Sequence, residues 1–251
     1  MPVLDRNGVQ IYYEIAGSGP LVLLTHGFTA STAMWTKNVP ALVAAGYRIL
    51  TWDMRGHGRS ASPDDQALYS SDLTVGDIDA LLDVAEADTA VIAGMSLGGC
   101  MSLAYHMAHP KRVRALMLID TGPGFKNDEA RERWNERARS RGDDLARRGK
   151  PALSTSSEAH LQEQNFNGLK RAAYGMLTQK NADAINSLPT IRVPTLVVVG
   201  DRDEPFLAAS DYMAAKIPGA AKVVIKDAGH ASNVDQPQAF NEAVIAFLQR
   251  L

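Results

Sequence analysis

The sequence predicts an α/β protein whose central, mostly parallel sheet is covered by helices on both faces. Continuous apolar runs at residues 21–25, 90–93, 113–119 and 194–199 have the length of strands that are buried on both faces. Stretches with helical periodicity separate these runs, and such alternation is typical of a parallel sheet. In sheets of this kind, functional sites form beyond the carboxyl ends of the strands.

The other elements follow from turn signals and from proline positions. The dipeptide Asn7-Gly8 indicates a hairpin between residues 3–6 and a half-exposed strand at residues 9–16. Pro110 stops the helix that begins after the strand at residues 90–93, and Pro237 suits the first turn of the closing helix. We further expect helices at residues 34–45, 73–85, 97–109, 207–216 and 237–251, and strands at 47–52 and 222–226.

The alternation of strands and helices is interrupted in the middle of the chain. Residues 126–150 are rich in Arg, Glu and Asp at helical spacing, and a second helical stretch is expected at about residues 158–177. We interpret the charges of the first stretch as a solvated helix face. The expected organisation is a core domain, residues 1–121 and 187–251, with a helical lid inserted at residues 122–186.

Composition excludes several classes of function. The chain has 251 residues, of which 45% are hydrophobic, enough for one domain with a sizeable core. A net charge of −2 gives no general attraction to nucleic acid or to anionic membranes. The N-terminal residues do not resemble a signal peptide, and the single cysteine, Cys100, fits a reducing compartment. We expect a cytoplasmic monomer or homodimer that binds a small molecule and neither nucleic acid nor membrane.

The pattern G-x-S-x-G, formed by Gly94, Ser96 and Gly98, marks the candidate nucleophile. It lies between an apolar strand and a helix, where a tight turn forces the serine into strained backbone angles. The two glycines leave room for that turn. Helix N–H groups without intrahelical partners would face the serine oxygen and would stabilise an anion there. The pattern therefore predicts that Ser96 is a nucleophile.

A serine hydroxyl is a weak nucleophile unless a base with a pKa near neutrality accepts its proton, and histidine fits this requirement. His230 lies in a loop after a late strand, where its side chain can swing over a strand end. We therefore predict that His230 is the base. The other histidines have less suitable places on helices, in the lid, among arginines or at a strand end; they are His26, His57, His106, His109 and His160.

An acid must hold the tautomer of the base and stabilise the imidazolium ion. Asp203 follows the strand at residues 194–199, and the order Ser, Asp, His is expected of hydrolases with this type of turn. We choose Asp203 for this role. Asp201 and Asp120 remain alternatives, and we expect Asp120 to anchor the turn at the lid hinge instead.

The tetrahedral intermediate needs two convergent N–H donors for its oxyanion. Leu97, the residue after Ser96, supplies one donor from the turn. The loop after the strand at residues 21–25 is expected to supply the other from Phe28, because Gly27 lets the backbone approach the substrate. His26 then has a structural task, since its ring can form hydrogen bonds with the loop backbone.

Taken together, these motifs resemble the α/β-hydrolase fold superfamily over essentially the full length of the chain. The matching segments are residues 26–28 (HGF), 53–60 (DMRGHGRS), 94–99 (GMSLGG), 200–203 (GDRD) and 228–230 (AGH). The resemblance implies a Ser-Asp-His triad, a lid and no cofactor or metal. In closer detail the chain is similar to short-lidded esterases, enol-lactone hydrolases and C–C bond hydrolases. Haloalkane dehalogenases and epoxide hydrolases carry an aspartate where this chain has Ser96, which counts against both activities.

The resulting hypothesis is a serine hydrolase that cleaves a small or medium acyl ester or lactone through an acyl-enzyme on Ser96. Alternative activities are C–C bond hydrolysis of an acidic ring-cleavage product, which requires an arginine in the pocket, and cofactorless perhydrolase chemistry. A receptor that binds a small ligand without turnover is the alternative outside enzymes. Residues that could line the pocket, or could equally belong to the core, are Trp35, Met95, Trp134, Phe166 and Phe206.

Overall fold

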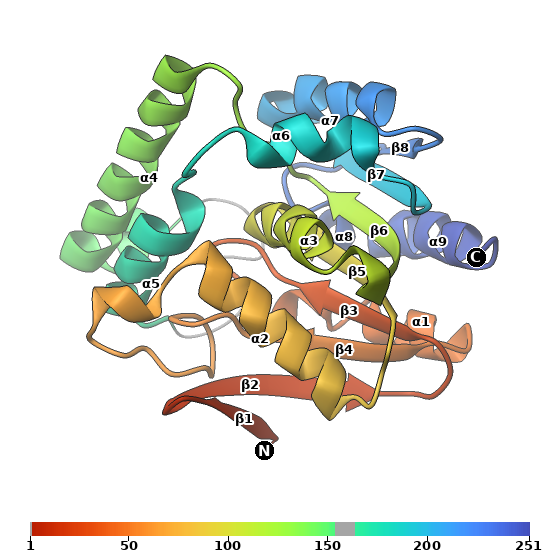
Figure 1. The fold of residues 1–251 in the computed structure, drawn as a ribbon, viewed down its shortest axis with the longest axis horizontal. Helices are drawn as coiled ribbons and strands as arrows, with labels where there is room; N and C mark the ends of the chain where they lie inside the picture. Colours follow the sequence, from red (N-terminus) through yellow and green to blue (C-terminus); the bar gives the residue numbers. More distant parts are fainter. Residues whose placement is uncertain (1, 154–163) are drawn as a thin grey trace.

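A computed structural model describes residues 2–153 and 164–251, and its centre is an eight-stranded sheet within these residues. The strand order is β1-β2-β4-β3-β5-β6-β7-β8, and the strands from β4 onward in this order pair in parallel (Figure 1). The strands are β1 (Val3–Arg6), β2 (Val9–Ala16), β3 (Leu21–Thr25), β4 (Arg48–Trp52), β5 (Ala90–Met95), β6 (Val113–Ile119), β7 (Thr195–Gly200) and β8 (Ala221–Ile225). The predicted α/β fold with a mostly parallel sheet is confirmed.

The expected N-terminal hairpin forms the antiparallel edge of this sheet. Asn7 and Gly8 have φ angles of 56° and 84°, which a two-residue turn between twisted strands requires. The register pairs Arg6 with Val9, and β2 then pairs antiparallel with β4. The turn dipeptide therefore fixed both the direction and the register of this edge.

Helices cover both faces of the sheet, as expected for parallel strands whose residues are buried on both sides. One hydrophobic cluster joins alternate strand residues to α2 (Ser71–Val84), α3 (Leu97–Ala108) and α7 (Glu204–Lys216). A second cluster joins the other strand residues to α1 (Val39–Ala44) and α9 (Pro237–Leu248). Figure 1 shows α2 and α3 in front of the sheet and α9 behind it.

The helix expected at residues 34–45 is two short helices in the structure. A 3-10 helix, η1, spans Thr32–Trp35, and α1 begins only at Val39. Pro40 lacks a backbone N–H and is tolerated in the first turn of a helix but not in its interior, so α1 begins just before this proline instead of continuing from η1. The expected helix after the β7 strand begins earlier than predicted, at Glu204, and an additional short helix, α8 (Ser232–Asp235), follows β8.

The segment between β6 and β7 contains helices and no strand among its described residues. Its elements are α4 (Asp128–Arg148), η4 (Lys150–Ala152), α5 (Phe166–Ala172), the π-helix η6 (Ala173–Leu177), α6 (Asp183–Ser187) and η7 (Leu188–Thr190). Part of the helix expected at residues 158–177 lies outside the described residues. Figure 1 shows α4 and α5 on the side of the sheet where the parallel strands have their carboxyl ends.

Candidate active site

The turn between β5 and α3 holds the candidate nucleophile. Ser96 has φ 52° and ψ −114°, a backbone conformation that costs free energy and that functional sites often contain. A Cβ atom on Gly94 would lie 2.1 Å from the carbonyl carbon of Gly98. One on Gly98 would lie 2.3 Å from the carbonyl oxygen of Thr25. Both positions therefore require glycine, which the sequence motif supplies.

Ser96, His230 and Asp203 form a chain of hydrogen bonds. Nε2 of His230 lies 3.0 Å from Oγ of Ser96, and Nδ1 lies 2.9 Å from Oδ2 of Asp203. The Asp203 carboxylate is buried, and the His230 side chain is half-buried. Three predicted site residues from three distant parts of the chain thus lie in hydrogen-bond contact.

Paired strands bring the loops of Asp203 and His230 together. The loop after β7 carries Asp203, and the loop after the neighbouring strand β8 carries His230. Two backbone hydrogen bonds join these loops: Asp201 donates to the Ile225 carbonyl at 2.9 Å, and Arg202 donates to the Ala228 carbonyl at 2.9 Å. The parallel pairing of the strands therefore sets the separation of the acid and the base.

Asp120, the alternative acid, is bound elsewhere. Its carboxylate accepts hydrogen bonds from the backbone N–H of Gly200, and from both the N–H and the hydroxyl of Ser232. Burial raises the pKa of Asp120 to about 7, and these hydrogen bonds act in the opposite direction. Asp120 therefore holds the end of β7 and the segment after His230, rather than the lid-hinge turn that we expected.

Ser232 is a site-supporting residue that the sequence reasoning missed. It lies two residues after the candidate base and has no exposed surface. Its contact with Asp120 joins residues 112 positions apart, so only the fold reveals the pair. The only available signal in the sequence was the polar pair that follows the histidine, Ser232-Asn233.

The loop after β3 lies directly against the Ser96 turn. A Cβ atom on Gly27 would lie 2.6 Å from Sδ of Met95 and 3.4 Å from Cβ of Ser96. Phe28 follows in this loop, and Leu97 is the first residue of α3, where helix N–H groups lack intrahelical partners. The two predicted oxyanion donors therefore belong to segments that meet at Ser96.

His26 stabilises this loop, as its sequence position suggested. Its Nε2 accepts a hydrogen bond from the Met54 N–H at 2.9 Å, so Nδ1 carries the proton and donates to the Gly27 carbonyl at 2.7 Å. Burial lowers the pKa of His26 to about 4, which keeps the ring neutral. The neutral ring ties the loop after β3 to the loop after β4.

The five aromatic and sulfur side chains that we predicted as pocket walls lie in different parts of the structure. Phe206 stacks on His230, with ring centroids 4.7 Å apart, and therefore borders the site. Met95 is buried beside the Ser96 turn. Trp35 is fully buried, and its ring packs 6.4 Å from that of Phe240 in the cluster beneath α9, which gives it a place in the core.

Trp134 and Phe166 lie in the helical segment between β6 and β7. The indole N–H of Trp134 donates to the Leu177 carbonyl at 2.9 Å, and its ring centroid lies 6.0 Å from that of Phe125. Phe166 packs against a small cluster formed by Leu145, Ala152 and Leu169. Phe28 packs against the same cluster, so residues of α4 and α5 contact the loop after β3. We call this loop, which carries Phe28, the candidate oxyanion loop.

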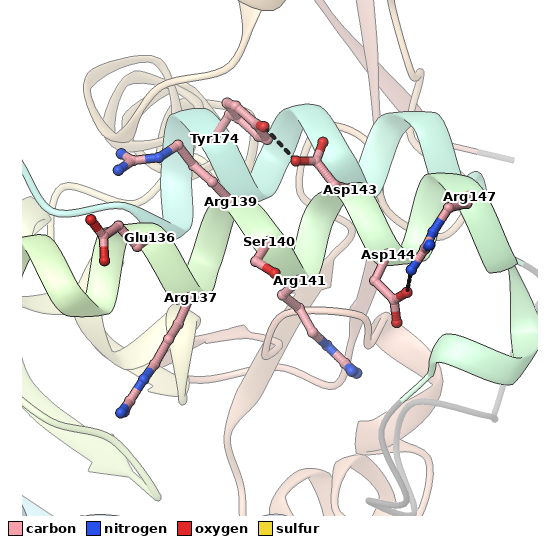
Figure 2. A pocket seen from close by; sticks show the side chains of 9 residues that line it. All are labelled: Glu136, Arg137, Arg139, Ser140, Arg141, Asp143, Asp144, Arg147 and Tyr174. Atoms are coloured by element: carbon pink, nitrogen blue, oxygen red, sulfur yellow. Dashed lines mark hydrogen bonds and ion pairs between the residues drawn. The ribbon is translucent and has the colours of Figure 1, made fainter.

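An open hollow of about 850 Å³ lies along α4 (Figure 2). Its walls are formed by Glu136, Arg137, Arg139, Ser140, Arg141, Asp143, Asp144, Arg147 and Tyr174. Ser96, Asp203 and His230 do not line it. The lining is dominated by charged groups, several of which pair with one another.

No group of His, Cys, Asp and Glu in residues 2–153 and 164–251 has an arrangement that could hold a metal ion. The same residues include no helix that is both long and apolar enough to span a membrane. Cys100 forms no disulfide and contacts Thr121 and the Gly122 carbonyl.

The fold and the site together define a class of protein. The chain belongs to the alpha/beta hydrolase family, which it matches over residues 21–243, and it is accordingly a hydrolase. The predicted superfamily is thereby confirmed.

Three individual proteins are similar to this chain over nearly its full length. A Bacillus subtilis (strain 168) protein named "Putative 2-succinyl-6-hydroxy-2,4-cyclohexadiene-1-carboxylate synthase" is 29% identical over 262 residues, covering 95% of each chain. The enol-lactonase from Burkholderia xenovorans LB400 has a TM-score of 0.81 and 27% identity, covering 99% of this chain and 100% of that one. A thermophilic esterase from Thermogutta terrifontis has a TM-score of 0.81 and 26% identity, covering 99% and 96%.

Proposed function

We propose that this protein is a serine hydrolase that cleaves a small or medium acyl ester or lactone. The observation that carries the proposal is the hydrogen-bond chain from Ser96 through His230 to the buried Asp203. A strained serine at the N-terminus of a helix, with a histidine in reach of its hydroxyl, has the geometry of an activated nucleophile. The similarity to an enol-lactonase and an esterase supports this substrate class.

In the proposed mechanism, Nε2 of His230 accepts the proton as Oγ of Ser96 attacks the carbonyl carbon. The Asp203 carboxylate holds the N–H at Nδ1 and stabilises the imidazolium ion that forms. The N–H groups of Leu97 and Phe28 stabilise the oxyanion. His230 then protonates the leaving alkoxide, and it activates the water that hydrolyses the acyl-enzyme.

The helical segment at residues 122–186 is, in this proposal, the lid that sets the substrate range. Its cluster of Leu145, Ala152 and Leu169 packs against Phe28, and the side-chain amide of Gln164 donates to the Thr29 carbonyl at 2.8 Å. These contacts place lid residues against the candidate oxyanion loop. Trp134 and Phe166 of this segment, with Phe206 and Met95 of the core, are the proposed apolar walls.

The first test is turnover by the purified protein of a panel of 4-nitrophenyl esters, lactones and dienoate ring-cleavage products. Ester or lactone turnover supports the proposal, whereas turnover confined to ring-cleavage products would assign C–C bond hydrolysis. Peroxide-dependent oxidation would reveal perhydrolase activity. Binding of panel members without any turnover would indicate a receptor.

The second test replaces the nucleophile. We expect Ser96→Ala to lower kcat by about 10⁴-fold or more, because the covalent route is lost while the fold persists. An organophosphonate should label Ser96 in the wild type, and His230→Ala should slow this labelling. Mass spectrometry would locate the adduct, and an adduct on another residue would refute the mechanism.

A further inference from the structure

In the part of the chain that the structure describes, two arginines of α4 have no carboxylate partner. The helix carries seven arginines, and within the described chain five of them pair with acidic residues of the same helix: Arg131, Arg133, Arg139, Arg147 and Arg148. Arg137 and Arg141 form neither a hydrogen bond nor an ion pair with any described residue. The acidic side chains of α4 therefore pair with the other five arginines, whereas Arg137 and Arg141 can bind an anionic ligand.

Arg137 and Arg141 lie on the same side of α4. Arg137 and Arg141 are separated by four residues, so their side chains are neighbours on the helix surface. Figure 2 shows both guanidinium groups on the same side of α4, directed away from the α5 helix, and both line the hollow. In this view the two guanidinium groups point to different sides, so each can meet an anion by itself. A single guanidinium group can hold a planar carboxylate through two parallel charge-assisted hydrogen bonds.

Arg141 is partly removed from water without a counter-ion. Its side chain is half-buried, and burial lowers the pKa of its guanidinium group, although the charge of Asp144 acts in the opposite direction. Both carboxylate oxygens of Asp144 are already bound, one by Arg147 and one by Arg148. A desolvated cation is costly unless an anion accompanies it, and an anionic ligand would remove that cost.

Arg141 lies close along α4 to the contact between this helix and the loop after β3. Leu145 follows Arg141 by one helical turn and therefore shares its face of α4. Leu145 has no exposed surface and belongs to the cluster against which Phe28 packs. Arg141 is thus one turn away from the contact between the helix and the loop that approaches Ser96.

We propose that Arg141 binds a carboxylate group of the substrate, so that the protein hydrolyses acidic esters or lactones. This inference rests on the proposed function, because it assumes that the scissile carbonyl lies at Ser96. Hydrolysis breaks the acyl C–O bond: the oxygen of water enters a second carboxylate, and the released alkoxy oxygen takes a proton and becomes an alcohol, which stays on the same molecule when the substrate is a lactone. The remote carboxylate stays bound to Arg141 and orients the acyl chain.

The kinetic test uses mono-4-nitrophenyl esters of linear dicarboxylic acids, from succinic to suberic acid. Each is paired with the neutral acyl ester of equal chain length. We expect the wild type to prefer one or more acidic esters, and Arg141→Gln to raise KM for these about tenfold, because charge-assisted hydrogen bonds are lost. KM for the matched neutral esters, and kcat for both, should change little.

The control variant is Arg133→Gln. It removes the same charge from the same helix, but Arg133 is exposed, is paired with Glu129 and does not line the hollow. It should leave both substrate series unchanged. If wild-type protein does not prefer any acidic ester, or if Arg141→Gln affects acidic and neutral esters equally, the inference is overturned while ester hydrolysis stands.

A binding test separates this inference from the proposed chemistry. Calorimetry with the monomethyl esters of the same dicarboxylic acids measures their affinity for Ser96→Ala and for Ser96→Ala combined with Arg141→Gln. An affinity that falls about tenfold for the acidic ligands, but not for the dimethyl esters, supports the arginine site even without turnover. Equal affinities in the two variants would refute it.

Discussion

At the residue scale, two buried aspartates near the candidate site are distinguished by their partners. Asp203 accepts from the histidine ring, whereas Asp120 accepts from Gly200 and Ser232. One carboxylate therefore contacts the imidazole of His230, and the other holds the segments that carry Asp203 and His230.

This division predicts different defects for two matched variants. Asp203→Asn keeps the side-chain shape but removes the charge that stabilises imidazolium, so kcat should fall by about 10⁴-fold, as for a triad aspartate. Asp120→Asn loses acceptor capacity toward the Ser232 and Gly200 donors and should cost about 1–3 kcal/mol of folding free energy, with a smaller loss of kcat. Steady-state kinetics and denaturant titrations measure both. The opposite ranking of kcat, in folded proteins, would move the acid to Asp120.

The pKa of Asp120 also predicts a pH effect on stability. Burial raises this pKa from its ordinary value of 3.8 to about 7, so the folded protein keeps a proton that the unfolded chain has already released. The associated stability is fully present below pH 4 and is lost as the pH rises through 7. The free energy of unfolding of Asp120→Asn should therefore improve relative to wild type between pH 4 and pH 8.

Denaturant titrations across this range measure the difference between the two proteins. Using the difference cancels the contributions of other groups, such as His26 and His57, whose pKa values are lowered by burial. If the free energy of unfolding of Asp120→Asn relative to wild type stays constant between pH 4 and pH 8, or falls, the raised pKa of Asp120 is contradicted.

At the element scale, close backbone contacts between β3, β5 and α3 hold the Ser96 turn. Gly98 lies where α3 touches the end of β3, and Gly94 lies where β5 touches the first turn of α3. These contacts allow the helix N-terminus to begin directly at Ser96. The strain of the serine backbone is therefore maintained by packing of the elements on either side of it.

A methyl group at Gly98 should disrupt this packing. The added Cβ of Gly98→Ala would lie 2.3 Å from the Thr25 carbonyl oxygen, and overpacking of this kind costs about 1–3 kcal/mol or more. We expect a lower melting temperature together with reduced esterase activity. Gly76→Ala in α2 is the control, because its Cβ meets only the end of the flexible Arg6 side chain, at 3.3 Å. That variant should change stability by less than about 1 kcal/mol. Equal losses in the two variants would refute the packing argument.

At the scale of the whole molecule, a buried ion pair joins the N-terminal hairpin, the loop after β4 and α2. The Asp77 carboxylate, which has no exposed surface, accepts from Arg55 at 2.6 and 2.9 Å and from Arg6 at 3.1 Å. These residues come from distant parts of the chain. Asp77 and Arg55 are buried, whereas the Arg6 side chain is 31% exposed. The antiparallel edge of the sheet is thereby fastened to the parallel core.

Removing the shared carboxylate should be costly. Asp77→Ala leaves the buried Arg55 without a counter-charge, and loss of one partner of a buried pair costs about 3–5 kcal/mol. Asp72→Ala, on the same helix, removes an exposed carboxylate paired with Lys180 and should cost at most about 1 kcal/mol. Calorimetric melting would show whether Asp77→Ala lowers Tm much more than Asp72→Ala, as we expect.

The sequence predicted most of the fold because local patterns and burial agreed. The strand at Val113–Ile119 was predicted with its observed bounds, since a continuous apolar run has few alternatives inside an α/β protein. The predicted helix at residues 34–45 was wrong because Pro40, which has no backbone N–H, is accommodated only in the first turn of a helix, and α1 therefore begins at Val39. The π-helix at Ala173–Leu177 has no local signal that distinguishes it from an α-helix.

The sequence by itself determined the chemical types at the candidate site: a strained serine between glycines, a loop histidine and an aspartate after a late strand. Only the tertiary structure decided which aspartate faces His230, because parallel strand order places the ends of β7 and β8 side by side. It also decided that Asp120 binds Ser232 and that Arg137 and Arg141 of α4 have no partner among residues 2–153 and 164–251. Motifs depend on neighbours in the chain, whereas hydrogen-bond partners depend on neighbours in space.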